Sequence, residues 1–384
     1  MTMKRSTGSY VTTSVVGESV QAFVPDLLPP VRPALAVEDF ADLNHAAELA
    51  LARLSGVAGL VPSVDWLLYS AIRKEALLTS QIEGTQASLT DLFDSEAGAN
   101  VSNADDVEEV TNYIRAFRYV EAQLRSPDGL PISTRLICEA HRLLMDGVRG
   151  GSKQPGEVRR SQNWIGGSRP GNAVFVPPPP KKVGELLAGM ERFIHNEQPA
   201  SPPLVRVALV HAQFETIHPF LDGNGRMGRL LIAALLEHWG LLPEPLMYLS
   251  GYLKANQLEY YRRLSEIRTE GDWESWIRFF LEGVAVAAGE AERNVIGLAR
   301  LVTEDRQRLL SVGKVSMAAV RLFEMLPTMP RFTVELVRQQ LDTTFPTASA
   351  AVKTLEELGI VVETTGHKKN RFFSYQRYVE FLDR

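Results

Sequence analysis

Apolar residues recur at three- to four-residue intervals along most of the chain, and this pattern predicts a mainly helical protein. The clearest case lies between Val64 and Ile82, where Gly84 follows as a stop signal. The same periodicity predicts long helices over 105–125 and 132–145. The first sixty residues are rich in proline and loosely patterned, so we expect helix to dominate only beyond them.

A segment of different composition interrupts the helical pattern between residues 147 and 180. Glycine and proline dominate this segment, and two strand-like stretches, QNWI and AVFV, flank the turn sequence GGSRPGN. Short strand patterns around a glycine-rich turn are typical of a β-hairpin. We therefore expect a hairpin that projects from a helical body. An ordinary surface hairpin, or a proline-rich ligand made by residues 177–180, is the alternative interpretation.

Helical patterning resumes after the hairpin. We expect helices over 183–196, 202–217, 227–240, 253–268 and 272–300. The stretch MGRLLIAALLEHWG at 227–240 is apolar nearly all round, which predicts the central buried helix. Tyr260 and Tyr261 belong either to the core or to the lining of a pocket.

The last seventy residues have the pattern of a separate unit. Three short helical segments precede two strand-like segments that are joined by a basic turn, an order typical of a winged helix. Between Lys314 and Arg384 there are ten Lys and Arg residues against eight Asp and Glu residues. The third helix carries Lys353 but also Glu356 and Glu357. DNA binding and protein binding are both compatible with so small a net charge.

Composition excludes several classes of protein. The formal net charge of −5 over 384 residues predicts no general attraction to nucleic acid or membranes. Cys138 is the only cysteine, which excludes an internal disulfide and the paired-cysteine zinc motifs. The longest apolar run, residues 230–236, is far too short to cross a bilayer, and the N-terminal segment is too polar for a signal peptide. We expect a cytoplasmic protein of two or three domains.

One stretch, HPFLDGNGRMGR at residues 218–229, has no role in a hydrophobic core. Gly223, Gly225 and Gly228 fit the glycine spacing of a dinucleotide-binding loop. A helix rather than a strand precedes them, however, and the lysine of a phosphate-binding P-loop is missing. The glycines are better explained as a loop that opens backbone amides to an anion at a helix N-terminus.

The charged residues of this stretch extend that interpretation. Arg226 and Arg229 are three residues apart on the first turn of the helix, so we expect both to face the same anion. Asp222 is a single carboxylate of the kind that holds Mg²⁺ together with substrate phosphates. His218 is the group in the loop that could take a proton near neutral pH. Together they predict a nucleoside-triphosphate site with a general base at its edge.

With these residues the chain resembles the Fic (Fido) family. Residues 218–229 match the family signature HxFx(D/E)GNGRxxR at every specified position. VPDLLPP, EAHRLLM, QNWIGG, AVFVPP and HAQFETIHPF are also similar to segments of bacterial Fic proteins. The resemblance implies a mainly α fold: a helical bundle with a β-hairpin flap, followed here by the winged helix. It also implies transfer of AMP from ATP to a hydroxyl group of a protein, the target or the chain itself.

The resemblance assigns a domain and a role to each part of the chain. Residues 1–125 would form a helical region containing an inhibitory helix at about 64–84, 126–300 the Fic core, and 310–384 the winged helix. His218 would deprotonate the target Tyr, Thr or Ser hydroxyl, Asp222 would hold Mg²⁺, and Phe220 would anchor the loop. The nucleotide would be bound by Gly223, Asn224, Gly225, Arg226, Met227, Gly228 and Arg229. A branch of the family with lysine at the position of Gly225 acts as a kinase, and this chain lacks that change.

An inhibitory motif is also implied. Thr79, Glu83 and Gly84 match (S/T)xxxE(G/N), and in the family such a glutamate pairs with the second arginine of the signature, here Arg229. ATP would then bind in a non-productive pose. A glutamate at a helix C-terminus is otherwise mildly unfavourable, by about 0.3–1 kcal/mol, so a solvated helix end is the alternative.

Further residues are implied at the edges of the site. The target would dock by strand addition on a flap made of Asn163, Trp164, Ile165, Gly166, Ala173, Val174, Phe175 and Val176. Asn256, Tyr260 and Tyr261 occupy the segment that contacts adenine and ribose in the family. His211 and His141 are interpreted as structural. A homodimer that buries the inhibitory helix is a further possibility of the family.

Two rival functions stay open. In one, the Fic core senses a nucleotide while the winged helix binds DNA through Lys368, Lys369 and Arg371. In the other, the enzyme also removes AMP, with Glu83 positioning a water molecule. The two roles of Glu83 predict opposite effects of its replacement. If Glu83 inhibits AMP transfer, replacing it releases that activity, whereas if Glu83 positions a water molecule for AMP removal, replacing it abolishes the removal.

Overall fold

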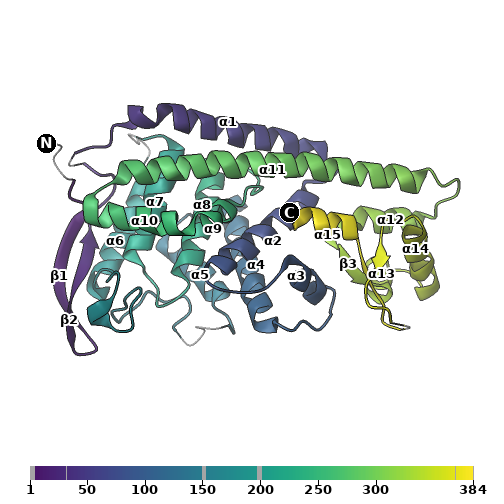
Figure 1. The fold of residues 1–384 in the computed structure, drawn as a ribbon, viewed down its shortest axis with the longest axis horizontal. Helices are drawn as coiled ribbons and strands as arrows, with labels where there is room; N and C mark the ends of the chain where they lie inside the picture. The colour runs from purple at the N-terminus through teal and green to yellow at the C-terminus, as the bar shows by residue number, and fades with distance from the viewer. Residues whose placement is uncertain (1–4, 32, 149–152, 197–200, 368, 384) are drawn as a thin grey trace.

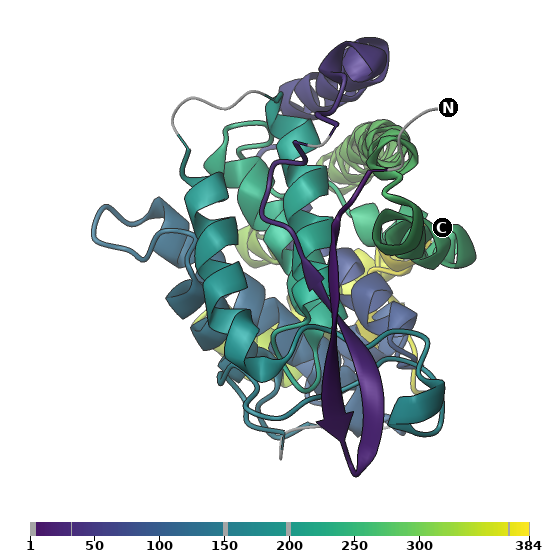
Figure 2. The ribbon, with the colours of Figure 1, turned by 90° about the vertical axis from the view of Figure 1, so that its left-hand side faces the viewer.

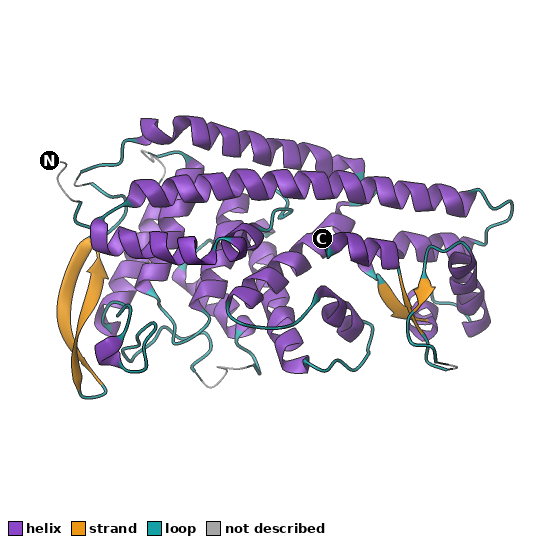
Figure 3. Ribbon diagram, viewed as in Figure 1, coloured by secondary structure: helices purple, strands orange, loops and turns teal. Residues whose placement is uncertain are grey.

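The computed structural model describes residues 5–31, 33–148, 153–196, 201–367 and 369–383. The fold is mostly helical, with small antiparallel sheets at its two ends (Figure 3). The helices are α1 (Ala41–Val57), α2 (Val64–Ile82), α3 (Leu89–Glu96), α4 (Ala104–Arg125), α5 (Thr134–Leu144), α6 (Pro180–Ile194), α7 (Pro203–Ile217), α8 (Asn224–His238), α9 (Leu249–Ala255), α10 (Gln257–Glu270), α11 (Trp273–Leu310), α12 (Met317–Met325), α13 (Val334–Gln340), α14 (Phe345–Glu357) and α15 (Gln376–Leu382). The mainly α class is confirmed.

The first residues of the chain, which the sequence indicated as loosely patterned, form a β-hairpin that was not predicted. Strands β1 (Gly8–Val15) and β2 (Glu18–Pro25) form an antiparallel hairpin with Gly8 opposite Pro25. Val16 and Gly17 close it with φ angles of 50° and 81°, the left-handed pair that matches the twist of a two-residue hairpin turn. The hairpin lies at the end of the molecule farthest from the C-terminal unit (Figure 1), and Figure 2 looks onto it.

Helix α7 is the most deeply buried element of the core. Every residue of α7 from Leu204 to Ile217 is buried, whereas α8, which the sequence indicated as the central helix, exposes part of its C-terminal turn. The α7 sequence carries polar residues such as His211 and Gln213 among its apolar ones, so composition alone did not mark it as central. The functional loop therefore joins the two helices that form the centre of the bundle.

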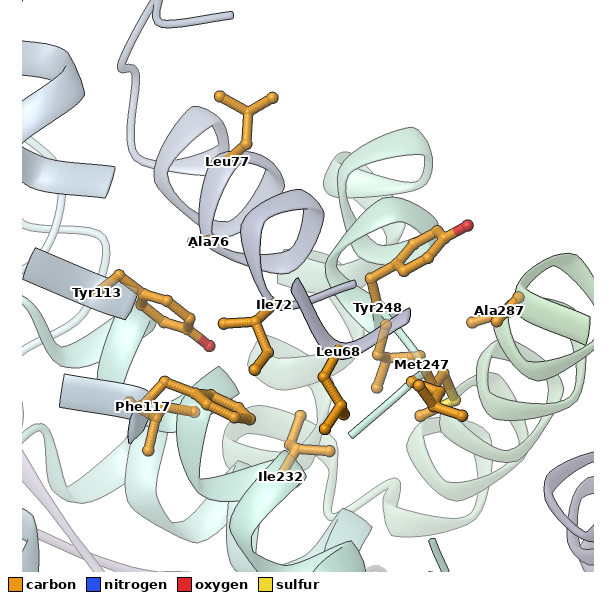
Figure 4. Packing of buried hydrophobic residues seen from close by; sticks show 14 of the residues in the cluster. Leu68, Ile72, Ala76, Leu77, Tyr113, Phe117, Ile232, Met247, Tyr248 and Ala287 are labelled. Atoms are coloured by element: carbon orange, nitrogen blue, oxygen red, sulfur yellow. The ribbon is translucent and has the colours of Figure 1, made fainter. Parts of the chain in front are cut away.

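Helix α2 packs across this centre, as its periodicity predicts. Leu68, Ile72 and Ala76 lie on its buried face, and Figure 4 shows Ile72 and Leu68 near Ile232 of α8. Phe117 of α4 belongs to the same cluster. Burial of each such side chain stabilises the fold by roughly 1.5–3 kcal/mol. The C-terminal end of α2 is thereby fixed relative to the start of α8.

Helix α11 is longer than predicted. It runs for 38 residues, from Trp273 to Leu310, rather than ending near residue 300. It lies beside α1 and extends along the molecule to the C-terminal unit (Figure 1). The carboxylate of Asp305, near its end, is fully buried, where it accepts a hydrogen bond from the Tyr375 hydroxyl at 2.9 Å. The added turns thus belong to the interface between core and C-terminal unit.

The C-terminal unit contains the expected three helices, α12, α13 and α14, and the expected two strands, together with one further strand and one further helix. Strands β3 (Arg331–Thr333), β4 (Val362–Glu363) and β5 (Phe372–Ser374) form a sheet in the order β3-β5-β4, followed by α15. Arg331 binds Asp94 of α3 with two bonds of 2.6 and 2.7 Å, which docks the unit onto the N-terminal region. On α14, Lys353 lies 3.5 Å from Glu357, so its charge is paired within the helix. A winged helix remains our prediction for this unit.

Close packing between α7 and α8 gives a stability prediction at Gly228. A Cβ atom there would lie 2.4 Å from Glu215 Oε1 and 3.3 Å from both the His211 and Phe214 rings. Gly228→Ala should therefore lower the free energy of unfolding by about 1–3 kcal/mol despite the better helix propensity of alanine. Gly184→Ala, in α6 where a Cβ meets nothing within 4 Å, should instead stabilise by about 0.5–1 kcal/mol. Urea unfolding of both variants checks this, and equal effects would contradict it.

Candidate active site

A cavity of about 400 Å³ lies beside the loop between α7 and α8. This volume falls within the range of small-molecule sites. Its walls come from β1, the end of α2, the flap region, α7, α8 and α10, and they include Tyr10, Glu83, Ile165, Gly166, Val174, Phe175, Glu215, His218, Gly225, Arg229, Tyr260, Tyr261 and Arg268. The cavity unites residues that the sequence assigned to a base, an anion site and an inhibitor.

His218 ends helix α7 in the left-handed conformation, with φ 50° and ψ 62°. Its amide still donates to the Phe214 carbonyl at 2.9 Å, so the chain turns sharply while the imidazole stays at the cavity. Burial, helped by the positive charges of Arg159 and Arg268, lowers the pKa of His218 to about 3. The imidazole is therefore neutral across the physiological range, and its Nδ1 has no hydrogen-bond partner in the described part of the chain.

Arg159 supports this conformation, and sequence reasoning missed it. Its Nε donates to the His218 carbonyl at 2.9 Å, and Nη2 donates to the Pro178 carbonyl at 2.5 Å. The Arg159 amide also donates to the Pro219 carbonyl at 2.9 Å. The side chain is almost fully buried, and in the described part of the chain it donates to backbone carbonyls alone. Burial lowers its pKa to about 10. Arg159 thus ties the base of the flap to the backbone of the catalytic loop.

The role of Arg159 can be measured against its neighbour. Arg159→Met leaves several buried carbonyls without donors, each costing about 1–3 kcal/mol, so we expect a loss of roughly 2–4 kcal/mol in the free energy of unfolding. Arg160 is the matched control, because its side chain is 81% exposed and bonds only to Glu157 in the described contacts. Arg160→Met should change stability by less than about 0.5 kcal/mol. Equal losses in the two variants would refute this role for Arg159.

The loop after His218 is held by side chains rather than by regular structure. Asn224 bonds both the amide and the carbonyl of Phe220 at 2.9 Å. The Phe220 ring stacks on His141, with centroids 3.7 Å apart, and His141 Nε2 lies 3.0 Å from the Asp222 carbonyl. Burial lowers the pKa of His141 to about 4. These contacts support the anchoring role predicted for Phe220 and the structural interpretation of His141.

Asp222 projects its carboxylate to the surface of the loop. Its Oδ1 accepts the Gly223 amide at 2.7 Å, and its Oδ2 accepts from Lys153 Nζ at 3.0 Å. Burial alone would raise the pKa of Asp222, but these two donors outweigh it and the pKa is lowered. The carboxylate is therefore ionised, as a Mg²⁺ ligand must be. Within the described ranges no cluster of three His, Cys, Asp or Glu residues could hold a metal ion by itself.

The two arginines of the signature point to different partners, contrary to the expectation that both face one anion. Arg226 Nη1 lies 3.2 Å from Glu109 of α4, and both side chains are buried. Arg229 donates from Nε to the Thr79 hydroxyl at 2.6 Å. Residues three apart on a helix share a face, but the acidic partners on α4 and α2 draw these side chains apart. Arg229 lines the cavity and Arg226 does not.

Glu83 meets Arg229 as the motif predicted. Its Oε1 accepts from Arg229 Nη2 at 2.6 Å, and the Thr79 carbonyl accepts from the same nitrogen at 3.1 Å. Gly84 follows with φ 100°, a conformation that ends α2 and lets Glu83 face α8. A Cβ on Gly225 would lie 2.3 Å from Glu83 Oε1, so the missing side chain at 225 leaves room for this carboxylate. Thr79 and Glu83 together occupy the hydrogen-bonding edge of the arginine.

Two further charged residues at the cavity were not predicted. Glu215, one turn before His218, is buried, and its Oε1 has no hydrogen-bond partner in the described part of the chain. Burial raises the pKa of Glu215 to about 7, although Arg229 acts in the opposite direction. Arg268 of α10 lies with its guanidinium 3.9 Å from the Phe175 ring centroid. Glu215 belongs to the segment HAQFETIHPF, one helical turn before His218, but that segment did not indicate its burial. Arg268 belongs to no short motif, and only the fold brings it to His218.

The flap is less regular than the predicted hairpin. Ile165 and Phe175 form an isolated antiparallel bridge, with 2.8 Å between the Ile165 amide and the Phe175 carbonyl, and a 3-10 turn over Pro170–Asn172 replaces the turn. Positive φ angles at Gly166 and Gly167 break the strands. Val176, Ala173 and Trp164 pack against the β1–β2 hairpin, and the Phe23 amide donates to the Val176 carbonyl at 2.9 Å.

The three residues expected to contact adenine and ribose differ in their burial and in their position relative to the cavity. Tyr260 is buried, and its hydroxyl lies 2.8 Å from Nε2 of the equally buried His211, which supports a structural role for that histidine. Tyr261 is 46% exposed and lines the cavity. Asn256 lies outside the cavity lining and donates to the Tyr252 carbonyl at 3.0 Å. Tyr261 is therefore the member of this group best placed to meet a ligand.

Comparisons with known proteins agree with this geometry. Residues 41–121 match the Fic/DOC family N-terminal model and residues 131–236 match the Fic/DOC family model. Over these two segments the chain is similar to the Fic/DOC family. Protein adenylyltransferase Fic of Drosophila ananassae is 30% identical over 211 residues, covering 53% of this chain and 38% of that protein. The protein of the same name from Drosophila grimshawi is 31% identical over 208 residues, covering 52% and 39%.

Solved structures show the same fold. A Fic family protein from Desulfovibrio desulfuricans matches with a TM-score of 0.57 at 21% identity, covering 89% of this chain and 97% of its own. Fic-1 of C. elegans matches with a TM-score of 0.52 at 23% identity, covering 69% and 73%. The chain spans about two fifths of the length of the curated relatives. Among the described residues, no helix combines the length and apolar character needed to cross a membrane.

Proposed function

We propose that the protein is an adenylyltransferase that moves AMP from ATP to a hydroxyl group of a protein, and that Glu83 holds it inhibited. The observation that carries this proposal is a neutral histidine at one edge of a cavity whose other edge is an arginine bound by a glutamate. The names of the curated relatives support the same reaction. ATP is the co-substrate and pyrophosphate the leaving product.

His218 would act as the general base. The target hydroxyl attacks the α-phosphorus of ATP, His218 takes the hydroxyl proton, and the bond from the α-phosphorus to the pyrophosphate oxygen breaks. A base of this kind typically contributes a factor of about 10²–10⁴ to the rate. Arg159 would be a positioning residue, because it bonds the His218 carbonyl and fixes a left-handed backbone.

The start of α8 would hold the phosphates. Gly223 and Gly225 place no side chain over its first amides, and the positive end of the helix dipole favours an anion there. Arg229 would bind the terminal phosphate once Glu83 leaves it, and Arg226 would turn from Glu109 to the phosphates. Met227 and Gly228 belong to the same turn, where Met227 is buried and Gly228 allows the close approach of α7.

Asp222 would supply a single carboxylate ligand to Mg²⁺. One ionised carboxylate, partly exposed, is the protein contribution that Mg²⁺ needs when phosphates and water complete an octahedron. When bound there, the ion would neutralise phosphate charge and orient the leaving group. Lys153 holds one oxygen of the carboxylate in this structure, so we infer that it gives way to the ion or bonds a phosphate in its place.

A target would reach the cavity over the flap. Val174 is 82% exposed at the cavity rim, and the segments 163–166 and 173–176 offer backbone groups for an extended segment of the target. The contact with β2 at Val176 occupies one position of this edge. Docking therefore involves the part of the flap around Ile165 and Val174.

The test of this proposal is AMP transfer in vitro. Cell lysate is incubated with labelled ATP, Mg²⁺ and the wild type, Glu83→Gly, or Glu83→Gly combined with His218→Asn. Labelled proteins should appear chiefly with Glu83→Gly and should disappear in the double variant. Absence of protein labelling with all three forms would overturn the proposal and favour a nucleotide sensor in its place.

A further inference from the structure

Tyr10, on strand β1, belongs to the lining of the cavity that contains His218 and Arg229. Among the described residues that line the cavity, Tyr10 is the one that belongs to the N-terminal hairpin. Its exposed fraction is 56%. The segments that match the Fic/DOC family models begin at residue 41, so they do not include the hairpin. A phenol at the mouth of a site that acts on protein hydroxyl groups is itself a candidate acceptor.

The ring of Tyr10 is held in place by an aromatic row. It lies opposite Phe23 of β2, with ring centroids 5.2 Å apart, and Phe23 in turn lies 6.4 Å from Phe175 of the flap. Arg268 covers the Phe175 ring. Offset and tilted aromatic pairs of this kind each contribute about 0.5–1.5 kcal/mol beyond their buried area. The Tyr10 ring is therefore packed beside the flap, at the cavity that His218 also lines.

Arg268 connects Tyr10 electrostatically to the catalytic histidine. Its charge interacts with Tyr10, with Glu215 and with His218. Its Nε atom is enclosed and has no hydrogen-bond partner in the described ranges. Such a donor would bind an oxygen of a phosphoryl group held between the rings of Tyr10 and His218. Arg268 thus lines the same cavity as Tyr10 and His218 and interacts with both.

The hairpin that carries Tyr10 is fixed to the core at several points. The Thr7 hydroxyl donates to the Ile267 carbonyl at 2.8 Å, directly before Arg268. Gln213 of α7 donates to the Asp26 carbonyl at 3.0 Å. Glu18 accepts from the Gly171 amide at 3.1 Å and pairs with Arg169 of the flap. The strand that carries Tyr10 is therefore held beside the cavity, which raises the effective concentration of its phenol as an acceptor.

We propose that Tyr10 is an intramolecular acceptor of the nucleotidyl group, so that the protein modifies its own N-terminal hairpin. This inference rests on the proposed function. The Tyr10 phenol oxygen forms a bond to the α-phosphorus of ATP, the α-phosphorus to pyrophosphate bond breaks, and the phenolic proton goes to His218. The products are a phosphodiester on Tyr10 and pyrophosphate, and no oxidant or reductant is involved.

Other hydroxyl groups of the hairpin are less suited to the reaction. Thr12, on the same face of β1, accepts a hydrogen bond from Gln21 at 3.0 Å and lies outside the cavity lining. Tyr261 lines the cavity but belongs to α10, in the segment proposed to meet the nucleotide. Thr12→Val is consequently a matched control for Tyr10→Phe, since both remove a hydroxyl from one face of one strand.

The experiment uses the full chain with Glu83→Gly, ATP and Mg²⁺, and maps modified peptides by mass spectrometry. We expect one AMP per chain, located on Tyr10, and at least a tenfold loss of self-modification when Tyr10→Phe is added. Thr12→Val should leave the modification in place. An AMP group found on a different residue, or equal modification after Tyr10→Phe, would overturn the inference.

Two further arms separate the possible failures. Glu83→Gly is mixed with a tagged His218→Asn chain, and modification of Tyr10 on the tagged chain as fast as on the active chain would exclude the intramolecular step. Labelling of lysate proteins by the same Glu83→Gly preparation reports the proposed function by itself. If lysate proteins are labelled while Tyr10 is not, the inference fails and the proposed function stands. If neither is labelled, the proposed function fails as well.

Discussion

Glu83→Gly should raise AMP transfer to protein by roughly 10- to 100-fold, the range of a regulatory coupling of about 1.4–3 kcal/mol. The reason is competition for one guanidinium. Arg229 is buried, with 2% of its side chain exposed, and Glu83 and Thr79 hold its bonding edge. A terminal phosphate can take the place of the carboxylate only if Glu83 leaves. Removing the carboxylate eliminates that cost and leaves the Thr79 contacts to hold Arg229 in position.

The control for this variant is another glutamate at a helix C-terminus. Glu96 is the last residue of α3 and binds Arg73 at 2.7 Å, away from the cavity. Glu96→Gly removes a comparable ion pair but should leave AMP transfer unchanged. Initial rates with labelled ATP, at equal folded protein, measure both variants. A fall in AMP transfer with Glu83→Gly would contradict inhibition, and loss of AMP removal from a modified protein would support the rival role of Glu83.

The inhibitory contact was predictable because both of its halves belong to short motifs. Thr79 and Glu83 are one helical turn apart, and Arg229 follows a glycine-rich loop, so local sequence specifies each conformation. What the sequence alone did not contain is the close approach of α2 and α8. That approach depends on side chains such as Ile72 and Ile232, which meet across 160 residues of chain. The family resemblance supplied this information, and the structure agrees with it.

The residues that escaped prediction depend on long-range contacts. Arg159 lies in a glycine-rich segment beside Arg160, and nothing in the sequence distinguishes the buried arginine from the exposed one. Glu215 reads as an ordinary polar residue of a helix, yet it is buried because α8 packs on that face through Gly228. Polar residues on the most buried helix were the available signal, since each needs a partner or a function.

The hairpin β1–β2 was missed for a local reason. Its first strand is rich in serine and threonine, and its turn is Val16–Gly17 rather than the asparagine–glycine pair that usually marks such a turn. The flap shows the opposite error. Strand-like composition at 162–165 and 173–176 predicted regular strands, but two left-handed glycines and a 3-10 turn reduce them to one bridge. Composition predicted the place of this element correctly and its regularity wrongly.

Replacing His218 in the Glu83→Gly background should reduce AMP transfer by about 10²–10⁴-fold, because proton removal from the acceptor then has no base. Asparagine is the sharper replacement. The residue at 218 has a φ angle of 50°, which asparagine tolerates better than alanine. His218→Asn should therefore keep the melting temperature closer to that of the parent than His218→Ala, while both lose activity. A variant that keeps more than a tenth of the parental rate would exclude His218 as the base.

The pH dependence of the reaction separates His218 from its neighbour. Because burial lowers the pKa of His218 to about 3, its basic form is present above that pH and is lost only as the pH falls through it. No decline from this histidine is expected between pH 8 and 5.5. Glu215, with a pKa raised to about 7 by burial, takes up a proton in that interval and would alter the charge facing Arg229. Rates should thus be flat in Glu83→Gly/Glu215→Gln, and an acid decline centred near 6.5 in that variant would show that His218 titrates as an ordinary exposed histidine.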